Sequence, residues 1–589
     1  MKTSSKRWLL ALGAALALAL LGGCASRPAL VARNAPACPP GTLPTQALSP
    51  ALVSGTQVRC TGPGADAPLA PTRVPRARDR FEEQDRDLPE QFIGVAISGG
   101  GSRAAVFGMR ALRELSRLGI LDHVSAVSTT SGGGLPGAYY ALNARFMNWD
   151  AAEDAMARDY LAPWIGKNLD PIALFSVIAT EENRSDLMAA VFDELFVDGH
   201  TYGDLGEFRP GIAPIWLANA TEIGHARRFT FAEREFARIN SALAPFPISQ
   251  AVMASAAFPG VFNSVTLRHF ATAYQPPAQG GKAAAAAAPP QVRYKHLIDG
   301  GPTDNLGIEA LLGLATSHER ALRAQGRAPA SAAGRPAGPG RCLLVVVDAH
   351  PRGVPSRFDH RPDLRGTLGR FIDLNFLEAI DALMEVRRAD LLGYVGLRDP
   401  GMAGGAARSS RVVHFDVPLA ASRLGQVRPV GGDAPRLETQ PVPADHFRCA
   451  AWHIGLGHLE SLQQDAKQQP QQDLTPELTA ALEEQLGLHQ HLVSQVATNF
   501  RLAGPAQCSP ELIRASLQEA ATLLVREDGR HQRMVCDWLK GHGLKVDASC
   551  GQPRPIGSLA RLPLQQRVLM KNRGTPGGFT EEVECVAVK

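Results

Sequence analysis

A serine within a glycine-rich turn is the first residue whose setting could do chemistry. Ser131 lies in segment 129–133, of sequence TTSGG, directly after an apolar stretch that predicts a strand, and Pro136 lies just inside the helix expected to follow. A sharp strand-to-helix turn exposes such a hydroxyl group, and small neighbours let backbone atoms crowd around it. The positive end of the helix dipole also faces the serine. Ser131 is therefore a candidate nucleophile; the alternative is a serine that only caps a glycine-rich helix start.

A second turn could stabilise the negative oxygen that develops when a serine attacks an ester. Segment 99–101 consists of three glycines, which let backbone N–H groups approach a substrate without side-chain interference. This turn follows the predicted strand 92–97, just as Ser131 follows the predicted strand 124–130. Because the carboxyl ends of neighbouring parallel strands line one crevice, both turns should face the same cavity. The predicted oxyanion hole comprises Gly99, Gly100, Gly101 and Ser102.

The glycine turn also fits a competing motif. Segment 99–104, GGGSRA, matches the G-x-G-x-x-A form of a dinucleotide-binding turn, and it follows a strand and opens a helix. A nicotinamide or flavin site needs an acidic residue at the end of the second strand to hold the ribose, but that place reads TTSG here. We therefore disfavour a dinucleotide cofactor. Arg103 could orient the turn or meet an anionic head group, but its place at a helix start assigns it no role.

Asp299 is the candidate base for Ser131. It follows the predicted strand 294–298 and precedes two glycines, so its carboxylate stands at a strand end beside unhindered backbone. A carboxylate that touches the serine directly can accept its proton once desolvation raises the pKa of the acid. Two alternatives stay open. Asp-Gly-Gly can be a simple turn, or Ser131, Asp299 and His350 can form a triad, since His350 follows the predicted strand 342–347.

These turns require a parallel sheet covered by helices. Apolar residues recur at helical spacing from Val106 to Leu118, between the predicted strands 92–97 and 124–130, which makes a strand–helix–strand unit. The expected fold class is therefore α/β, with helices on a mainly parallel sheet. Three further predicted strands should extend the same sheet, namely 214–219, 294–298 and 342–347.

Changes in composition divide the rest of the chain. Two stretches rich in alanine, glycine and proline, near 275–291 and 325–341, are typical of flexible surface inserts without chemistry. Beyond residue 445 the composition favours helices, and cap-plus-proline pairs beginning at Thr475 and Ser509 predict helix starts. A helical C-terminal domain is therefore expected over 445–589.

The N-terminal residues resemble a bacterial lipoprotein signal. A short basic start is followed by an apolar run over 8–21, which is shorter than the roughly 20 residues that span a membrane, and then by Leu-Gly-Gly-Cys. These four residues resemble the lipobox, which implies a signal peptide over 1–23 and a lipid on Cys24. Ala25 after the cysteine implies the outer membrane. Segment 24–87, rich in proline and alanine, is expected to be a tether.

The other eight of the nine cysteines suit an oxidising compartment. Proximity in sequence favours a pair between Cys38 and Cys60, and pairs among the last four cysteines of the chain. No Cys-x-x-Cys pair occurs, which disfavours a structural zinc site or a redox motif.

The composition disfavours a nucleic-acid-binding protein. The chain has 589 residues, 45% of them apolar and 20% charged, which is typical of a folded protein. Lys and Arg number 61 against 57 acids, a net charge of +4; removal of 1–23, with Lys2, Lys6 and Arg7 and no acid, leaves +1. A nearly neutral protein lacks the basic footprint of a nucleic-acid binder.

The order and spacing of the three turns resemble the patatin-like phospholipase family. Segment 254–259, ASAAFP, is also similar to the family's Ala-Ser-x-Ala-x-Pro segment, and the resemblance covers about 91–420. Thr129 stands where the usual Gly-x-Ser-x-Gly pattern has its first glycine. The resemblance implies a three-layer α/β/α fold in a hydrolase domain over 88–440. It also implies a Ser131–Asp299 dyad that hydrolyses acyl esters of membrane lipids and needs no metal or other cofactor.

Two classes of function follow from this sequence. The first is a lipid acyl hydrolase held at the outer membrane by a lipid on Cys24. The second is an envelope scaffold or binding protein with the same fold and no catalysis, a hypothesis motivated by Thr129 and the C-terminal extension. Replacement of Ser131 by alanine separates the two, because it should abolish turnover in the first and change nothing in the second.

Overall fold

The computed structural model describes most of the chain from residue 88 onward. The expected signal peptide over 1–23, the expected lipidation residue Cys24 and the predicted helix start at Thr475 lie outside the described residues. So do most of the expected tether, the whole insert near 275–291 and residues 328–339 of the second insert. The described residues are 34–36, 43–44, 60–61, 80–81, 85, 88–171, 182–206, 208–270, 293–327, 340–351, 375–397, 411–420, 428–429, 442–459, 492–493, 496–504, 508–527, 529–552, 566–575 and 578–587.

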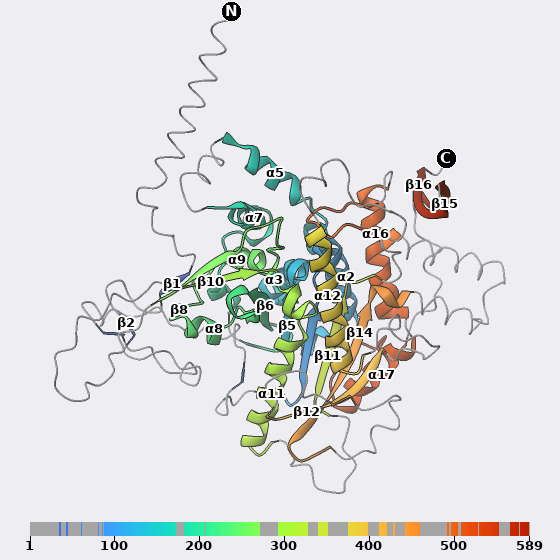
Figure 1. The fold of residues 1–589 in the computed structure, drawn as a ribbon. Helices are drawn as coiled ribbons and strands as arrows, with labels where there is room; N and C mark the ends of the chain where they lie inside the picture. Colours follow the sequence, from blue (N-terminus) through green and yellow to red (C-terminus); the bar gives the residue numbers. More distant parts are fainter. Residues whose placement is uncertain are drawn as a thin grey trace, which may run out of the picture.

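A ten-stranded mixed sheet forms the centre of the molecule (Figure 1). Its five middle strands are all parallel, and the strands that flank them run antiparallel. The five strand predictions are confirmed, with β10 joining the sheet antiparallel to β6. In spatial order the strands are β13 (Arg428–Pro429), β12 (Val412–Pro418), β14 (His446–Gly455), β11 (Cys342–Asp348), β4 (Phe92–Ile97), β5 (Ala126–Thr130), β6 (Ile215–Glu222), β10 (Arg293–Ile298) and β9 (Val265–His269), and β7 (Arg227–Thr230) pairs with β6.

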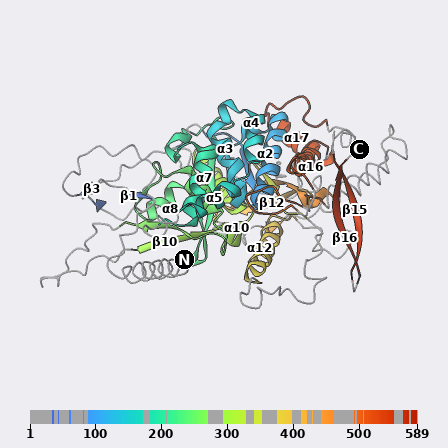
Figure 2. The same ribbon diagram turned by 90° about the horizontal axis from the view of Figure 1, so that it is seen from above.

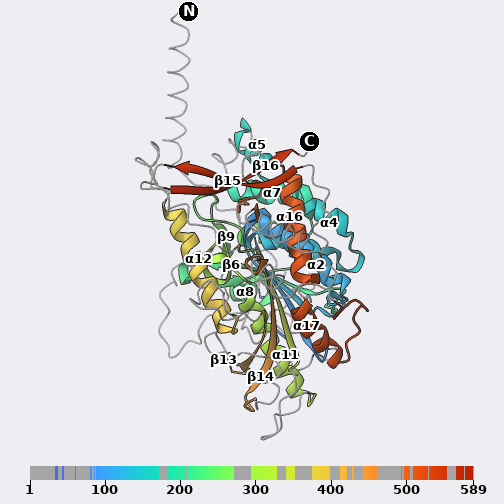
Figure 3. The same cartoon turned by 90° about the vertical axis from the view of Figure 1, so that its right-hand side faces the viewer.

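Helices cover both faces of this sheet. The residues of β4 are all buried because alternate side chains enter two different hydrophobic clusters, Ile93 and Val95 on one face and Phe92 and Ala96 on the other. Figure 2 and Figure 3 show α12 on one side of the sheet and α2 on the other. The first face carries α2 (Gly101–Arg117), α3 (Gly134–Asn143), α4 (Trp149–Met156), α7 (Arg184–Phe192) and α9 (Ile248–Ser255), and the second carries α11 (Ile308–Ala324) and α12 (Asn375–Tyr394). The predicted three-layer α/β/α architecture is confirmed.

Shorter elements connect and extend these layers. The remaining helices are α5 (Leu161–Leu169), α8 (Glu233–Arg238), α10 (Gly301–Asp304), α16 (Pro510–Thr522) and α17 (Gly529–Gly541), with single turns η1 (Leu121–His123), η2 (Ser131–Gly133), η3 (Ala144–Phe146), η4 (Asp193–Val197), η5 (Tyr202–Leu205), η6 (Ile223–His225), η9 (Leu456–His458) and η10 (Leu523–Glu527). Three two-stranded sheets pair β1 (Ala35–Pro36) with β8 (Ser241–Ala242), β2 (Leu43–Pro44) with β3 (Cys60–Thr61), and β15 (Gln566–Thr575) with β16 (Gly578–Ala587).

The expected boundary of a separate helical domain at residue 445 is wrong. Residues 446–455 form β14, which lies inside the main sheet between β12 and β11. Hydropathy does not reveal this strand, because its buried polar side chains find partners on distant strands. Arg448 donates to Asp416 on β12 at 2.9 Å, and His453 contacts Asp348 on β11 at 3.0 Å.

The helices after β14 also share the core of the preceding part. Apolar residues of α16 and α17 belong to the same hydrophobic cluster as those of α2. The predicted start of α16 is confirmed: the side chain of Ser509 accepts a hydrogen bond from the Leu512 N–H, and Pro510 occupies the first helical turn. Burial in one common core makes the C-terminal helices part of the same folding unit.

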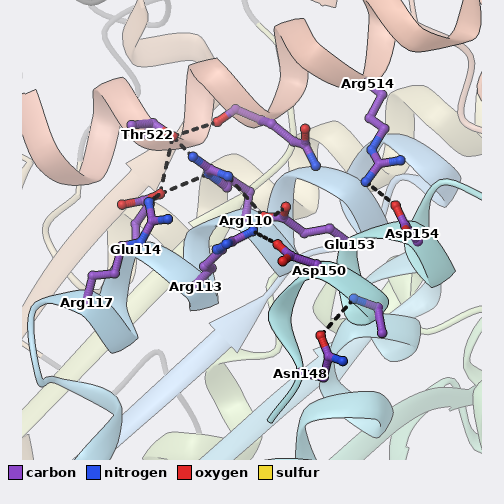
Figure 4. A network of polar contacts seen from close by, with 12 residues as sticks. Arg110, Arg113, Glu114, Arg117, Asn148, Asp150, Glu153, Asp154, Arg514 and Thr522 are labelled. Atoms are coloured by element: carbon purple, nitrogen blue, oxygen red, sulfur yellow. Dashed lines mark hydrogen bonds and ion pairs between the residues drawn. The ribbon is translucent and has the colours of Figure 1, made fainter.

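A polar network joins α16 to α2 and α4 (Figure 4). Arg110 on α2 donates to Thr522 on α16 at 3.0 Å and to Glu153 on α4 at 3.2 Å. A second ion pair joins Arg514 on α16 to Asp154 on α4 at 2.6 Å. These contacts fix the C-terminal helices against the helix that begins at the glycine turn.

Three disulfides lie within the described residues. Cys508 pairs with Cys585 and Cys536 pairs with Cys550, which confirms the prediction of pairs among the last four cysteines. The third, Cys342–Cys449, links neighbouring residues of the parallel strands β11 and β14 and was not predicted. Cys38 lies outside the described residues, so its pair with Cys60 stays a prediction. None of the described helices has the length and apolar character needed to cross a membrane.

Candidate active site

Ser131 occupies a strained turn between β5 and α3. Its φ is +51°, a left-handed backbone conformation that costs a non-glycine residue of order 1 kcal/mol or more. The turn continues through η2 directly into α3, whose N-terminus lies beside the serine. The Ser131 N–H donates to the side chain of Ser255 at 2.9 Å, which helps to hold the turn. This is the strand–turn–helix geometry expected of a nucleophile elbow.

Glycines next to Ser131 let two loops pack backbone against backbone. A Cβ atom on Gly132 would overlap the backbone of Gly101, and one on Gly133 would come within 2.5 Å of the carbonyl oxygen of Ser98. The serine turn therefore lies directly against the glycine turn that follows β4. The register agrees, because Ile97 at the end of β4 is paired with Thr129 on β5.

Thr129 fits where the usual elbow pattern has glycine. Its hydroxyl accepts a hydrogen bond from the indole N–H of Trp216 at 3.1 Å, so the buried polar group is satisfied. The opposite residue on α3 is Gly137, and a Cβ atom there would overlap the Thr129 methyl group. The space that a glycine in the strand would leave is thus supplied by a glycine in the helix. The departure from the motif is sterically compensated.

The antiparallel strand β10 brings Asp299 to the serine. Its last residue, Ile298, is paired with Thr221 on β6, while Asn219 on β6 is paired with Thr130 on β5. Asp299 therefore ends level with the elbow, and its carboxylate forms a hydrogen bond with the Ser131 side chain. The predicted base and nucleophile are in direct contact.

The environment of Asp299 suits a proton acceptor. The side chain is 3% exposed, and burial raises its pKa to about 6, although hydrogen bonds from the Gly301 N–H and from Ser131 act in the opposite direction. The Gly301 N–H donates to Asp299 at 2.8 Å and fixes one carboxylate oxygen. A carboxylate with a pKa near 6 is ionised at neutral pH and is still basic enough to take a serine proton during attack.

The four residues predicted as the oxyanion hole fall into two pairs. The Gly99 N–H donates to the Asn305 carbonyl at 2.9 Å, and the Ser102 N–H donates to the Asn499 carbonyl at 2.8 Å. Within the described part of the chain, the N–H groups of Gly100 and Gly101 have no such acceptor. Both of these glycines have positive φ, +132° and +55°. The structure thus leaves two donors beside Ser131 and engages the other two.

Residues 95–312 match the model of the patatin-like phospholipase family. This patatin-like region contains both turns of the site, Ser131 and Asp299. It ends within α11, so β11, β12, β14 and the C-terminal helices lie beyond it.

Three solved structures of human GIVD cytosolic phospholipase A2 are similar to this chain. One matches at 19% identity over 26% of this chain and 23% of that chain, with a TM-score of 0.19. A complex with methyl gamma-linolenyl fluorophosphonate and terbium chloride matches at 20% identity over 25% and 24%, with a TM-score of 0.20. A complex with methyl gamma-linolenyl fluorophosphonate matches at 14% identity over 74% and 58%, with a TM-score of 0.31. This chain spans less than two thirds of each of those chains, and the curated proteins gave no significant match.

Two residues of the patatin-like region that support the site were missed at the sequence level. Ser255 at the end of α9 accepts the Ser131 N–H and donates to the Asn219 carbonyl at 2.6 Å, while its own carbonyl accepts the Gly300 N–H at 3.1 Å. Ser255 therefore connects the nucleophile turn to the Asp299 turn. Its place in the ASAAFP segment was the available signal.

Asn305 is the second of these residues. Besides accepting the Gly99 N–H through its carbonyl, it places its side-chain oxygen against Gly99 and Gly301, where added Cβ atoms would meet it. Asn305 thus lies between the glycine turn and the Asp299 turn. It follows Asp299 by six residues, and nothing in its sequence pattern marks it.

His350 lies beside a different carboxylate. Its ring contacts Glu385 on α12 at 3.2 Å, and its N–H donates to Asp348 at 3.0 Å. Asp299 instead contacts Ser131 and Gly301. These contacts favour a direct Ser–Asp pair over the Ser131–Asp299–His350 triad.

Neither a dinucleotide nor a metal ion finds an evident place among the described residues. Backbone carbonyls of 498–499 lie against the N-terminus of α2, where the pyrophosphate of a dinucleotide would bind. No group of three or more His, Cys, Asp and Glu side chains within the described ranges could hold a metal ion. The residues at the site suit nucleophilic acyl transfer.

Proposed function

We propose that this chain is a serine acyl hydrolase that cleaves fatty-acyl ester bonds of membrane lipids. One observation carries the proposal: Ser131, in a left-handed elbow, contacts a buried aspartate whose pKa is raised to about 6. The patatin-like match over 95–312 supports lipid esters as the substrate class. The two unengaged N–H groups next to the serine support an acyl-transfer reaction.

The proposed reaction runs through an acyl-enzyme. The Ser131 oxygen attacks the ester carbonyl while its proton passes to Asp299, and the N–H groups of Gly100 and Gly101 donate to the resulting oxyanion. Collapse of this intermediate breaks the ester bond, and Asp299 returns the proton to the departing alcohol oxygen. Asp299 then takes a proton from water, which attacks the acyl-serine and releases the fatty acid and free Ser131.

A covalent probe tests this proposal directly. We expect a fluorophosphonate to label the purified protein at Ser131, located by peptide mass spectrometry, and the label to be lost in Asp299→Asn. Ser131→Ala should remove hydrolysis of both a p-nitrophenyl ester and phospholipid vesicles while far-UV circular dichroism stays unchanged. Heat-denatured wild type controls for nonspecific labelling. An intact, folded protein with neither label nor turnover would instead be a binding protein of the same fold.

We also propose that a lipid on Cys24 holds the enzyme at the outer membrane, near its substrate. The Leu-Gly-Gly-Cys sequence before Ala25 supports this location. Mass spectrometry of the N-terminal peptide of the mature protein, purified from its native membrane, should find diacylglyceryl-modified Cys24. An unmodified N-terminal peptide that retains residues 1–23 would contradict the anchor.

A further inference from the structure

A C-terminal segment lies against the glycine turn although about 400 residues separate them in sequence. The Ser102 N–H and hydroxyl both donate to the Asn499 carbonyl at 2.8 Å, and the same hydroxyl contacts the Arg501 carbonyl at 2.9 Å. The guanidinium of Arg103 donates to the Val496 carbonyl at 3.1 Å. We call residues 496–504 the clamp segment.

The clamp segment supplies what the start of α2 lacks. A helix begins with N–H groups that have no partner within the helix, and α2 has no side-chain cap. Carbonyl groups of the clamp segment take the place of such a cap at Ser102. The positive guanidinium of Arg103, whose pKa burial lowers to about 10, stays protonated at neutral pH and adds a further bond.

Gly101 is enclosed by backbone on both sides. A Cβ atom there would overlap the Thr498 carbonyl of the clamp segment, and Gly132 of the serine turn packs against its backbone from the other side. The orientation of the Gly101 N–H is therefore set by two neighbours, one on the elbow and one on the clamp segment.

The clamp segment is itself firmly placed. The ring of Phe500 is buried against Phe192 on α7 at 5.2 Å and Phe262 at 6.2 Å, and its carbonyl accepts the Tyr160 N–H at 3.0 Å. Arg501 pairs with Asp159 at 3.2 Å. Aromatic packing thus anchors the residue that lies between the two carbonyls that accept Ser102.

We propose that the clamp segment positions the oxyanion donors, so that catalysis depends on residues outside the patatin-like region. The inference rests on the proposed function and names Ser102 as a positioning residue. Its bonds keep its own N–H away from the substrate and hold Gly100 and Gly101 with their N–H groups unengaged. Oxyanion donors must lie within about 2.7–3.1 Å of the developing charge, so a small displacement costs rate.

The test measures hydrolysis of a soluble p-nitrophenyl ester by full-length Ser102→Ala. We expect kcat and the rate of fluorophosphonate labelling to fall about tenfold, with KM within twofold of wild type and the pH midpoint unchanged. Ser317→Ala is the matched control, because Ser317 is also a buried serine that donates to a carbonyl, at 2.7 Å, but on α11. It should lower the melting temperature similarly and leave kcat within twofold.

Asn499→Ala provides a second variant if Ser102→Ala does not fold. Asn499 is exposed, and its side chain accepts the Arg501 N–H at 3.0 Å, which shapes the turn that aligns the two acceptor carbonyls. We expect a several-fold loss of kcat at unchanged KM. Wild-type kcat in folded Asn499→Ala, together with wild-type kcat in any folded Ser102→Ala, overturns the inference. Failure of the proposed function is recognised separately, because wild type itself would then show neither label nor hydrolysis.

Discussion

Two buried carboxylates lie at the ends of neighbouring parts of the same sheet and have opposite properties. Asp299 follows β10 and Asp348 ends β11, with exposed fractions of 3% and 0%. Burial raises the pKa of Asp299 to about 6. Burial alone would raise that of Asp348 too, but Arg388 and His453 outweigh it and hold that pKa well below its usual range.

The difference comes from what each strand end faces. Asp348 accepts two hydrogen bonds from Arg388 on α12, at 2.6 Å and 2.9 Å, and one from His453 on β14 at 3.0 Å. Asp299 has only neutral donors, Ser131 and the Gly301 N–H. A carboxylate neutralised by a cation is a poor base, whereas one held by neutral groups remains basic. Equal burial therefore yields a structural anchor in one place and a proton acceptor in the other.

The largest expected effect is that of Asp299→Asn. The substitution removes the base, so we expect kcat for ester hydrolysis to fall about 10³-fold. Because the folded-state pKa of Asp299 lies above its unfolded value, its ionisation costs the folded protein stability as pH rises from about 4 through 6. Asp299→Asn should therefore melt at a higher temperature than wild type at pH 8, by differential scanning calorimetry. A lower melting temperature at pH 8 would contradict the assigned environment.

Asp348→Asn should act on stability instead. It leaves the buried Arg388 without its counter-charge, a change that costs about 3 kcal/mol in the free energy of unfolding. Urea denaturation at pH 7 measures this loss, and kcat per folded molecule should stay within about fivefold. Since the pKa of Asp348 is lowered, its contribution is present above its unfolded pKa and is lost as pH falls below it.

A double variant controls for this effect. Asp348→Asn with Arg388→Met removes both charges and should recover much of the lost stability. Unchanged stability in Asp348→Asn alone would show that the two carboxylates do not differ as described.

The pH dependence of catalysis gives the next effect. Asp299 must be deprotonated to accept the serine proton, so kcat should be level above pH 7 and fall about tenfold per unit well below pH 6. Initial rates with a p-nitrophenyl ester between pH 4.5 and 8.5, corrected for the absorbance of the product, measure the midpoint. The residual rate of Asp299→Asn should lack this step, and a midpoint near 4 would contradict the raised pKa.

His350→Gln should have the smallest effect. His350 contacts Glu385 and the Asp348 side, so we expect kcat within twofold of wild type and a free energy of unfolding within about 0.5 kcal/mol. Steady-state kinetics at pH 8 measures this. A loss of 100-fold or more would restore the Ser131–Asp299–His350 triad and would separate catalysis from the Ser–Asp contact.

Most of the site could be predicted because its demands are local. Gly132 and Gly133 leave room for the elbow, the glycine turn follows a short apolar strand, and Asp-Gly-Gly ends another. Such turns are written in neighbouring residues, and the parallel pairing of β4 and β5 then brings two of them together. The partition of the oxyanion donors was not predictable, because the acceptors at Asn305 and Asn499 are remote in sequence from the turn.

The C-terminal part was the least predictable. The strand β14 contains Arg448 and His453, whose charges and ring are buried only because Asp416 and Asp348 receive them. A hydropathy pattern cannot anticipate partners that lie 32 and 105 residues away. The predicted helix start at Ser509 succeeded because a cap is again a local signal.

The sequence by itself determined the α/β class, the elbow at Ser131, the glycine turn and the candidate base, since short-range sterics and strand patterns specify them. Tertiary structure decided which donors stay unengaged, which of two buried carboxylates remains basic, and that residues 496–504 hold the glycine turn. The physical reason is that hydrogen-bond partners and desolvation depend on what packs around a group. For this site, much of that packing comes from distant parts of the chain.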